Sequence, residues 1–149
     1  MLVPVVDNPE SWMAIDVACR LSAERGASIS AVAVLEVPPL LPLDAHLAEQ
    51  EEDARRLLER AGATGDSFGV KVTPHVARGR DAGVAILQEA AASEAELIVL
   101  GAARKLLEST GAVVFGNTVR HILVSAPCRV LVVAARSDAE SRPAVRPAA

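Results

Sequence analysis

The chain has 149 residues, of which 51% are hydrophobic and only 2% are aromatic, and its formal net charge is -4. This length suits one domain with a sizeable core, which must be built from Ala, Val, Leu and Ile. The negative charge and the scarcity of aromatic residues argue against binding of nucleic acid, which requires a basic surface or stacking platforms.

Short apolar runs alternate with longer segments in which apolar residues recur every three or four positions. The first pattern predicts strands buried on both faces, and the second predicts amphipathic helices. In chain order, we expect a strand at residues 2–6, a helix at 12–25, a strand at 28–37, a helix at 44–63, a strand at 70–77, a helix at 82–94, a strand at 97–100, a helix at 118–124 and a strand at 129–133. Right-handed crossovers between such strands give an α/β fold, with a parallel sheet covered by helices on both faces.

Several element boundaries carry recognisable signals. Pro4 interrupts the pairing of the first strand, because proline cannot donate to a ladder. Gly26 ends the first helix. Asp81 is expected to cap the third helix, and Asn117 is expected to cap the fourth.

The connections and the C-terminus are less regular. Residues 38–43 contain three prolines, so they form a loop whose leucines are either a contact surface or a cover for the end of the sheet. The charges of the 44–63 helix are interpreted as a solvated face with ion-pair support. We expect one domain over residues 1–135 and a disordered tail over residues 136–149.

Targeting signals are not evident in this sequence. The chain does not open with a secretion signal, and no apolar run approaches the roughly 20 residues of a membrane span. We therefore expect a cytoplasmic domain. Cys19 and Cys128 are interpreted as small buried hydrophobic side chains.

The candidate binding site lies at the carboxyl ends of the first and fourth strands, where sheets of this kind bind ligands. Gly101 and Gly116 would allow backbone amides to approach a phosphate at the N-terminus of the fourth helix. Asn117 and Thr118 would add side-chain donors, and Asp7 would accept a hydrogen bond from an amine or a ribose hydroxyl.

Arg104 and Lys105 would add positive charge to this site. Each candidate also has a structural alternative. The polar residues would cap helices, the glycines would serve tight turns, and the basic pair would be solvated surface.

The sequence holds no P-loop, dinucleotide-binding or nucleophile-elbow motif. His46, His75 and His121 are expected on different elements, and no cysteine has a histidine at a metal-site spacing. We predict no catalytic residues, and no metal beyond a Mg²⁺ that accompanies a nucleotide. Weak nucleotide hydrolysis would need His121 or Asp7 as a base.

Nearly the whole chain, to about Ala134, resembles the universal stress protein family. The resemblance rests on Leu2–Val5, Gly79–Asp81 and Leu97–Gly101, and most specifically on Gly116–Leu123 followed by Ala126–Val133. It implies a five-stranded parallel sheet in order 3-2-1-4-5, a Rossmann-like fold of the adenine nucleotide alpha hydrolase-like type. It also implies a homodimer that forms through the fifth strand.

One branch of this family binds ATP through the pattern Gly-x2-Gly-x9-Gly-Ser/Thr. Gly101 matches its first glycine, whereas Arg104 stands at the second, and Gly116 comes about two residues late for the third. Asn117 and Thr118 follow where the pattern has Ser or Thr. Arg104 therefore argues against ordinary ATP binding.

The resemblance implies a dimeric regulatory domain that binds an adenine nucleotide, ATP or AMP. The residues expected at this site are Pro4, Asp7, Val34, Gly101, Arg104, Gly116, Asn117 and Thr118. The alternative is a protein-interaction domain without a nucleotide, such as the cytoplasmic regulatory part of a membrane transporter. The chain also resembles the stress-protein domains attached to bacterial amino-acid permeases.

Overall fold

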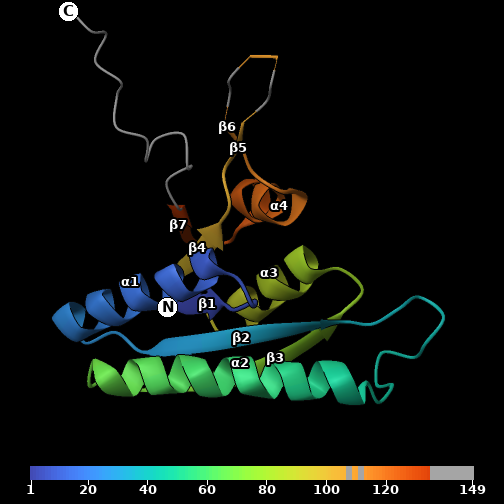
Figure 1. Cartoon of the computed structure of the whole chain (residues 1–149), viewed down its shortest axis with the longest axis horizontal. Coiled ribbons are helices and arrows are strands. Elements are labelled where there is room, and N and C mark those ends of the chain that lie inside the picture. The colour runs from blue at the N-terminus through green and yellow to red at the C-terminus, as the bar shows by residue number, and fades with distance from the viewer. Residues whose placement is uncertain (107–108, 111–112, 135–149) are drawn as a thin grey trace, which may run out of the picture.

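The computed structural model describes residues 1–106, 109–110 and 113–134. Within these residues, five parallel strands form the main sheet and four helices connect them (Figure 1). In chain order the elements are β1 (Leu2–Pro4), α1 (Pro9–Arg25), β2 (Ile29–Glu36), α2 (Ala48–Ser67), β3 (Val72–Gly79), α3 (Ala82–Ala92), β4 (Leu97–Ala102), β5 (Lys105–Leu106), β6 (Val113–Val114), α4 (Asn117–Ser125) and β7 (Arg129–Ala134).

The main sheet has the strand order β3-β2-β1-β4-β7. This confirms the expected order 3-2-1-4-5, with β7 as the fifth strand of the predicted sheet. β2 pairs with β3 along its whole length, and β4 does the same with β7. The strand order reverses between β1 and β4, so the connections after these two strands leave opposite faces and open a crevice between them.

Pro4 ends β1 and marks this crevice. Val5 donates a backbone hydrogen bond of 2.8 Å to the carbonyl of Val32 on β2. The backbone N–H groups of successive strand residues point toward the neighbouring strands on opposite sides. Since the N–H of Val5 points to β2, the position of the missing N–H of Pro4 faces β4. Within the described sheet, β1 pairs with β4 only at Leu2↔Ile98. The expected interruption is confirmed, and it leaves the carboxyl end of β4 unpaired on this side.

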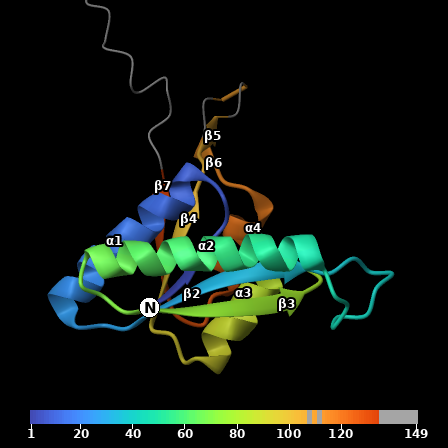
Figure 2. The ribbon, with the colours of Figure 1, turned by 60° about the horizontal axis from the view of Figure 1, so that its bottom comes forward.

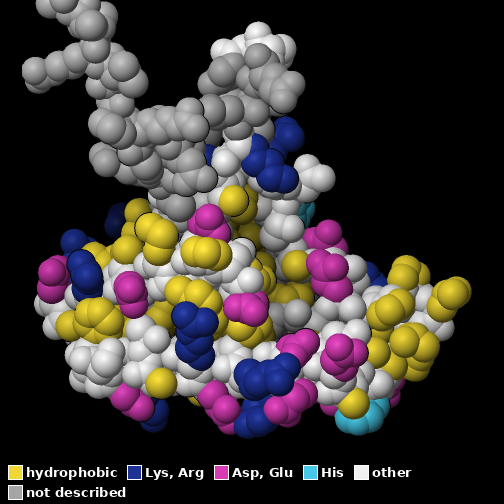
Figure 3. Space-filling view, viewed as in Figure 1, with side chains coloured by type: hydrophobic (Ala, Val, Ile, Leu, Met, Phe, Trp, Pro, Cys, Tyr) yellow, Lys and Arg dark blue, Asp and Glu magenta, His cyan; other side chains and the backbone are white. Residues whose placement is uncertain are grey.

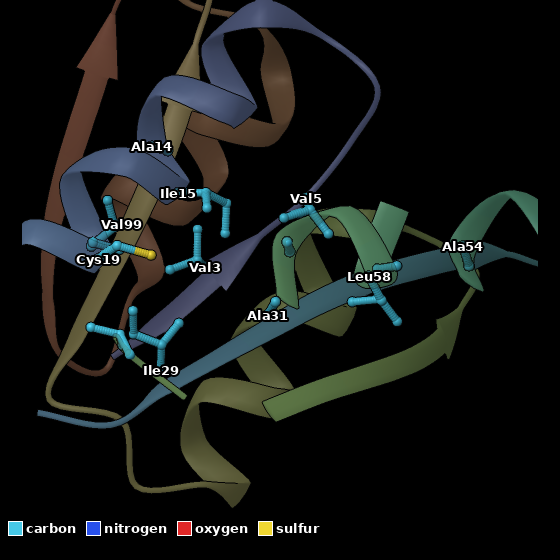
Figure 4. Close-up of a cluster of buried hydrophobic side chains, with 14 of the residues drawn as sticks. Val3, Val5, Ala14, Ile15, Cys19, Ile29, Ala31, Ala54, Leu58 and Val99 are labelled. Carbon is cyan, nitrogen blue, oxygen red and sulfur yellow. The ribbon is translucent and has the colours of Figure 1, made fainter. Parts of the chain in front are cut away.

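Two helical layers cover the sheet (Figure 2). α1 and α2 pack on one face around Val3, Ile15 and Leu58, which Figure 4 shows in close-up. α3 and α4 pack on the other face, around a cluster that includes Leu2 and Ile122. Neighbouring strand residues point to opposite faces, so each strand must be apolar on both sides. This explains the continuous apolar runs of the sequence.

The ends of α1 follow from local chemistry. The Oδ1 atom of Asn8 accepts a hydrogen bond of 2.8 Å from the backbone N–H of Ser11, so Asn8 caps the helix and Asp7 does not. Gly26 ends the helix in the left-handed conformation, with φ of 67°, as predicted.

α2 begins at Ala48 and ends at Ser67, so the predicted range of residues 44–63 is wrong by four residues at each end. Arg78 of β3 donates to the carbonyl oxygens of Leu43 and Ala45, at 3.3 and 2.8 Å, and so holds these residues outside the helix. Gly65 remains inside the helix and packs tightly against the start of β3. A Cβ at this position would lie only 2.7 Å from the carbonyl oxygen of Val70, so there is no room for a side chain. None of the described helices, α2 included, is long and apolar enough to cross a bilayer.

The segment after β4 contains a short antiparallel ribbon that the sequence did not predict. β5 and β6 pair at Lys105↔Val114 and Leu106↔Val113, and this ribbon stands out from the body of the molecule (Figure 1). The predicted disordered tail, residues 136–149, lies outside the described residues.

The two cysteines differ in burial. Cys19 of α1 is completely buried, as predicted, whereas Cys128 is only half-buried beside the second core cluster. Burial raises the pKa of both thiols. Both side chains therefore act mainly as packing groups.

Candidate functional site

A cavity of about 670 Å³ opens at the carboxyl ends of β1, β2 and β4. The connection after β1, the N-terminal half of α2 and the N-termini of α3 and α4 surround it. Its volume lies within the roughly 300–1,000 Å³ of small-molecule pockets, and it occupies the position at which doubly wound sheets bind ligands.

The cavity brings together most of the residues predicted for the site. Those that line it are Pro4, Asp7, Val34, Gly101, Gly116 and Thr118. Arg104 and Asn117 are not among its lining residues, although both are neighbours of residues that are. Arg104 is half-buried and has an interaction partner of its own.

The connection between β1 and α1 is held in a defined shape by Ser11. The buried Oγ of Ser11 accepts a hydrogen bond of 3.0 Å from the backbone N–H of Val6. Together with the cap at Asn8, this bond fixes the backbone on both sides of Asp7. The Asp7 carboxylate is exposed at the cavity and plays no part in the helix cap.

Gly101 has a packing role in addition to its place in the cavity wall. A Cβ at this position would lie 2.7 Å from the backbone nitrogen of Ser11 and closer still to the carbonyl group of Glu10. Such distances are too short for any side chain. Gly101 is therefore required where β4 passes the first turn of α1.

The N-termini of α3 and α4 both border the cavity, but they differ in whether described side chains cap them. At α3, the Asp81 carboxylate accepts from the N–H of Val84 at 2.9 Å, and the Glu36 carboxylate accepts from the N–H of Ala82 at 3.0 Å. Asp81 is thus the cap that the sequence predicted. Carboxylates already occupy this N-terminus.

At α4 the N-cap residue is Gly116, so the prediction that Asn117 caps the helix is wrong. The Gly116 carbonyl accepts from the N–H of Arg120 at 3.1 Å, which places Asn117 and Thr118 inside the first turn. Among the described residues, no side chain caps this helix. Its first N–H groups and the positive end of its dipole remain available to an anion.

Four polar side chains at the cavity are free to meet a ligand. Within the described part of the chain, Asp7, Gln50, Lys105 and Thr118 line the cavity without a hydrogen bond or an ion pair to another protein group. Thr118 belongs to the first turn of α4, and Lys105 on β5 pairs with Val114, two residues before the N-cap Gly116. Gln50 lies across the cavity on α2.

Sequence reasoning missed the contribution of β2 and α2 to this site. Glu36, Gln50 and Asp53 line the cavity, and Asp53 also forms an ion pair with Arg56. Glu36 could have been predicted at the site from its position at the carboxyl end of a strand. Gln50 and Asp53 could not, because the sequence of α2 resembles that of an ordinary solvated helix and does not show which residues face the cavity.

The three histidines lie apart from one another, as predicted. His46 pairs with Glu51 at 2.8 Å, and His75 pairs with Glu89 at 3.0 Å. His121 packs against Gly83, where a Cβ would lie 3.0 Å from its ring. Among the described residues, no group of three or more His, Cys, Asp or Glu side chains could hold a metal ion.

Comparison with known proteins places this fold. A universal stress protein family model matches residues 1–134. A family protein from Burkholderia pseudomallei is 25% identical, with a TM-score of 0.69 over 90% of this chain and 94% of that one. A universal stress protein from Archaeoglobus fulgidus in complex with dAMP is 18% identical, with a TM-score of 0.69 over 89% and 94%.

A family protein from Arabidopsis thaliana with AMP bound is 16% identical, with a TM-score of 0.63 over 97% of this chain and 95% of that one. Among curated protein sequences, none matches the chain significantly. The family model spans all of the described residues, and the observed strand order is the one that the resemblance implied. The chain therefore belongs to the universal stress protein family.

Proposed function

We propose that the cavity binds an adenine nucleotide, with its phosphate at the N-terminus of α4, and that the chain is a regulatory domain without catalytic activity. The observation that carries this proposal is the N-terminus of α4, which no described side chain caps, together with Lys105 and Thr118, which have no partner among the described residues. The corresponding end of α3 is occupied by Glu36 and Asp81, so it offers no second place for a phosphate.

The rest of the cavity suits a nucleoside. Pro4, Val34 and Leu57 supply apolar surface for a base, and Asp7 is an acceptor for an exocyclic amine or a ribose hydroxyl. The nucleotides bound in two similar structures, dAMP and AMP, each consist of an adenine base, a sugar and one phosphate. Such a ligand would regulate the protein by binding one conformation or assembly state more tightly than another.

Lys105 provides the direct test. Replacing its ammonium in a Lys105→Met variant removes a charge-assisted hydrogen bond to the phosphate, so the affinity for AMP should fall about tenfold. Isothermal titration calorimetry of wild type and variant measures this ratio. Lys71→Met is the matched control, since Lys71 precedes β3 and does not line the cavity.

Two results would contradict the proposal. One is that adenosine, AMP, ADP and ATP all fail to bind the folded wild-type protein at millimolar concentration. The other is that Lys71→Met weakens AMP binding as much as Lys105→Met does. A phosphate bound at the α4 N-terminus would not be affected by the Lys71→Met change, because Lys71 does not line the cavity.

A second function, recognition of a protein partner, is favoured by the loop between β2 and α2. Leu40 of this loop is 98% exposed, and the space-filling view shows the loop as an apolar projection (Figure 3). Arg80 donates hydrogen bonds to the carbonyl oxygens of Val37 and Pro38, which fix the backbone where the loop leaves β2. Retention of the chain by a solubilised amino-acid permease would test a transporter partner, and equal retention of a Leu40→Ser variant would count against it.

We also propose that the chain forms a homodimer through β7. This strand is at one edge of the described sheet, and its Leu131 side chain is 37% exposed. An edge strand with exposed apolar residues is a template for pairing with another chain. A second copy would cover it.

A further inference from the structure

The charges around the cavity are unevenly distributed. Three carboxylates line it, from three separate elements: Asp7 after β1, Glu36 at the end of β2 and Asp53 on α2. Lys105 is the single cationic side chain among the described lining residues. Resting on the proposed function, we infer that the cavity accepts an adenine nucleoside with at most one phosphate and discriminates against ATP.

The donor end of the cavity matches one phosphate group. It offers the Lys105 ammonium, the Thr118 hydroxyl and the α4 N-terminus, which acts as roughly half a positive charge. A monophosphate carries about 1.5 to 2 negative charges at pH 7, so these groups balance it. The two further phosphates of ATP bring more negative charge without a second cationic side chain among the described lining residues.

Neither of the other candidate positive groups changes this balance. The α3 N-terminus already holds the Glu36 and Asp81 carboxylates. Arg104 does not line the cavity and is engaged with a partner of its own. Additional phosphates would therefore add negative charge to a cavity whose described lining already carries three carboxylates, which disfavours binding of a more highly charged anion.

The carboxylates of Glu36 and Asp53 are the specificity-determining groups in this inference. Both can be neutralised with little change of shape. In Glu36→Gln the amide oxygen can still accept from Ala82, so the α3 N-terminus keeps a partner. In Asp53→Asn the ion pair with Arg56 is lost, and Arg56→Gln removes the same ion pair while leaving the carboxylate in place.

The test is calorimetric titration with adenosine, AMP, ADP and ATP, in EDTA and again with Mg²⁺. We expect AMP to bind at least tenfold more tightly than ATP in EDTA. The Glu36→Gln/Asp53→Asn double variant should narrow this ratio severalfold by strengthening ATP binding. Arg56→Gln should not narrow it, because the carboxylate remains. Circular dichroism confirms that each variant is folded.

The outcomes separate this inference from the proposed function. If ATP binds the wild type as tightly as AMP in EDTA, the inference is overturned and nucleotide binding stands. If the double variant leaves the ratio unchanged, or Arg56→Gln narrows it equally, the carboxylates do not set the preference and the inference fails. If no nucleotide binds, the proposed function itself falls.

Discussion

At the scale of single residues, Gly101 has a packing role and also lines the candidate site. It matches the first glycine of the family's nucleotide-binding pattern, and it lines the cavity. The structure adds a reason that needs no ligand, since β4 passes so close to Glu10 and Ser11 that a Cβ has no room. A glycine at this position is therefore not by itself evidence of phosphate binding.

Gly101→Ala should destabilise the fold by about 1–3 kcal/mol, because the added methyl group forces β4 away from α1. Urea denaturation followed by circular dichroism measures the change in the free energy of unfolding. Gly62→Ala is the matched control. A Cβ at Gly62 meets nothing within 4 Å, and alanine should stabilise α2 there by about 1 kcal/mol. Unchanged stability of Gly101→Ala would contradict the packing argument.

At the scale of elements, the start of α2 is decided by contacts that are distant in sequence. The Glu51 carboxylate accepts from the N–H of Leu47 at 3.2 Å and forms an ion pair with Arg78 of β3. The hydrogen bond from Leu47, followed by Arg78 and His46, lowers the pKa of Glu51, against a smaller opposing effect of desolvation. The carboxylate thus acts as a cap from within the helix.

This lowered pKa predicts a pH dependence of stability. The folded protein binds the Glu51 proton less readily than the unfolded chain does. The stabilisation is therefore full above the ordinary glutamate pKa of about 4.3, and it is lost as the pH falls through that value and below it. Glu51→Gln should be less stable than wild type at pH 7 and should lose less stability between pH 7 and pH 4. Urea unfolding at both pH values measures this.

Glu49→Gln is the control for the Glu51 prediction. It removes the same charge from the first turn of α2 without touching Leu47 or Arg78. Its loss of stability on acidification should remain close to that of the wild type. If Glu51→Gln and Glu49→Gln behave alike, general charge effects rather than the Leu47 and Arg78 contacts govern the start of α2.

At the scale of the whole molecule, the strand order has two consequences. It creates the crevice between β1 and β4, into which the connections after both strands and the N-terminus of α4 converge. It also places β3 and β7 at the two edges of the described sheet. The candidate binding site and the proposed dimer surface are thus both products of topology.

The proposed dimer predicts a mass of twice the chain's 15.5 kDa. Leu131→Lys should shift the protein toward the monomer, because a charge on an edge strand opposes pairing with another strand. Size-exclusion chromatography with light scattering measures the mass. Val76→Lys adds the same charge to β3, the opposite edge strand, where Val76 is 42% exposed, and it should leave the dimer intact. A monomeric wild type would rule out this assembly.

The sequence by itself determined the fold and placed many of the predicted site residues along one cavity. Buried parallel strands must be apolar on both faces, so their runs are visible without a structure, and local caps such as Gly26 and Asp81 follow from the residue type. The carboxyl ends of the strands then place Asp7 and Thr118 at a common edge. All of these features depend on short-range patterns or on general rules of topology.

Only the tertiary structure decided what depends on contacts between distant segments. Arg78 sets where α2 begins, Gly116 rather than Asn117 caps α4, and the packing of α2 brings Asp53 to the cavity. A sequence read locally shows the charge of such residues but not the groups opposite them. The balance of one ammonium against three carboxylates among the described lining residues, on which the proposed ligand preference rests, therefore appears only once the chain is folded.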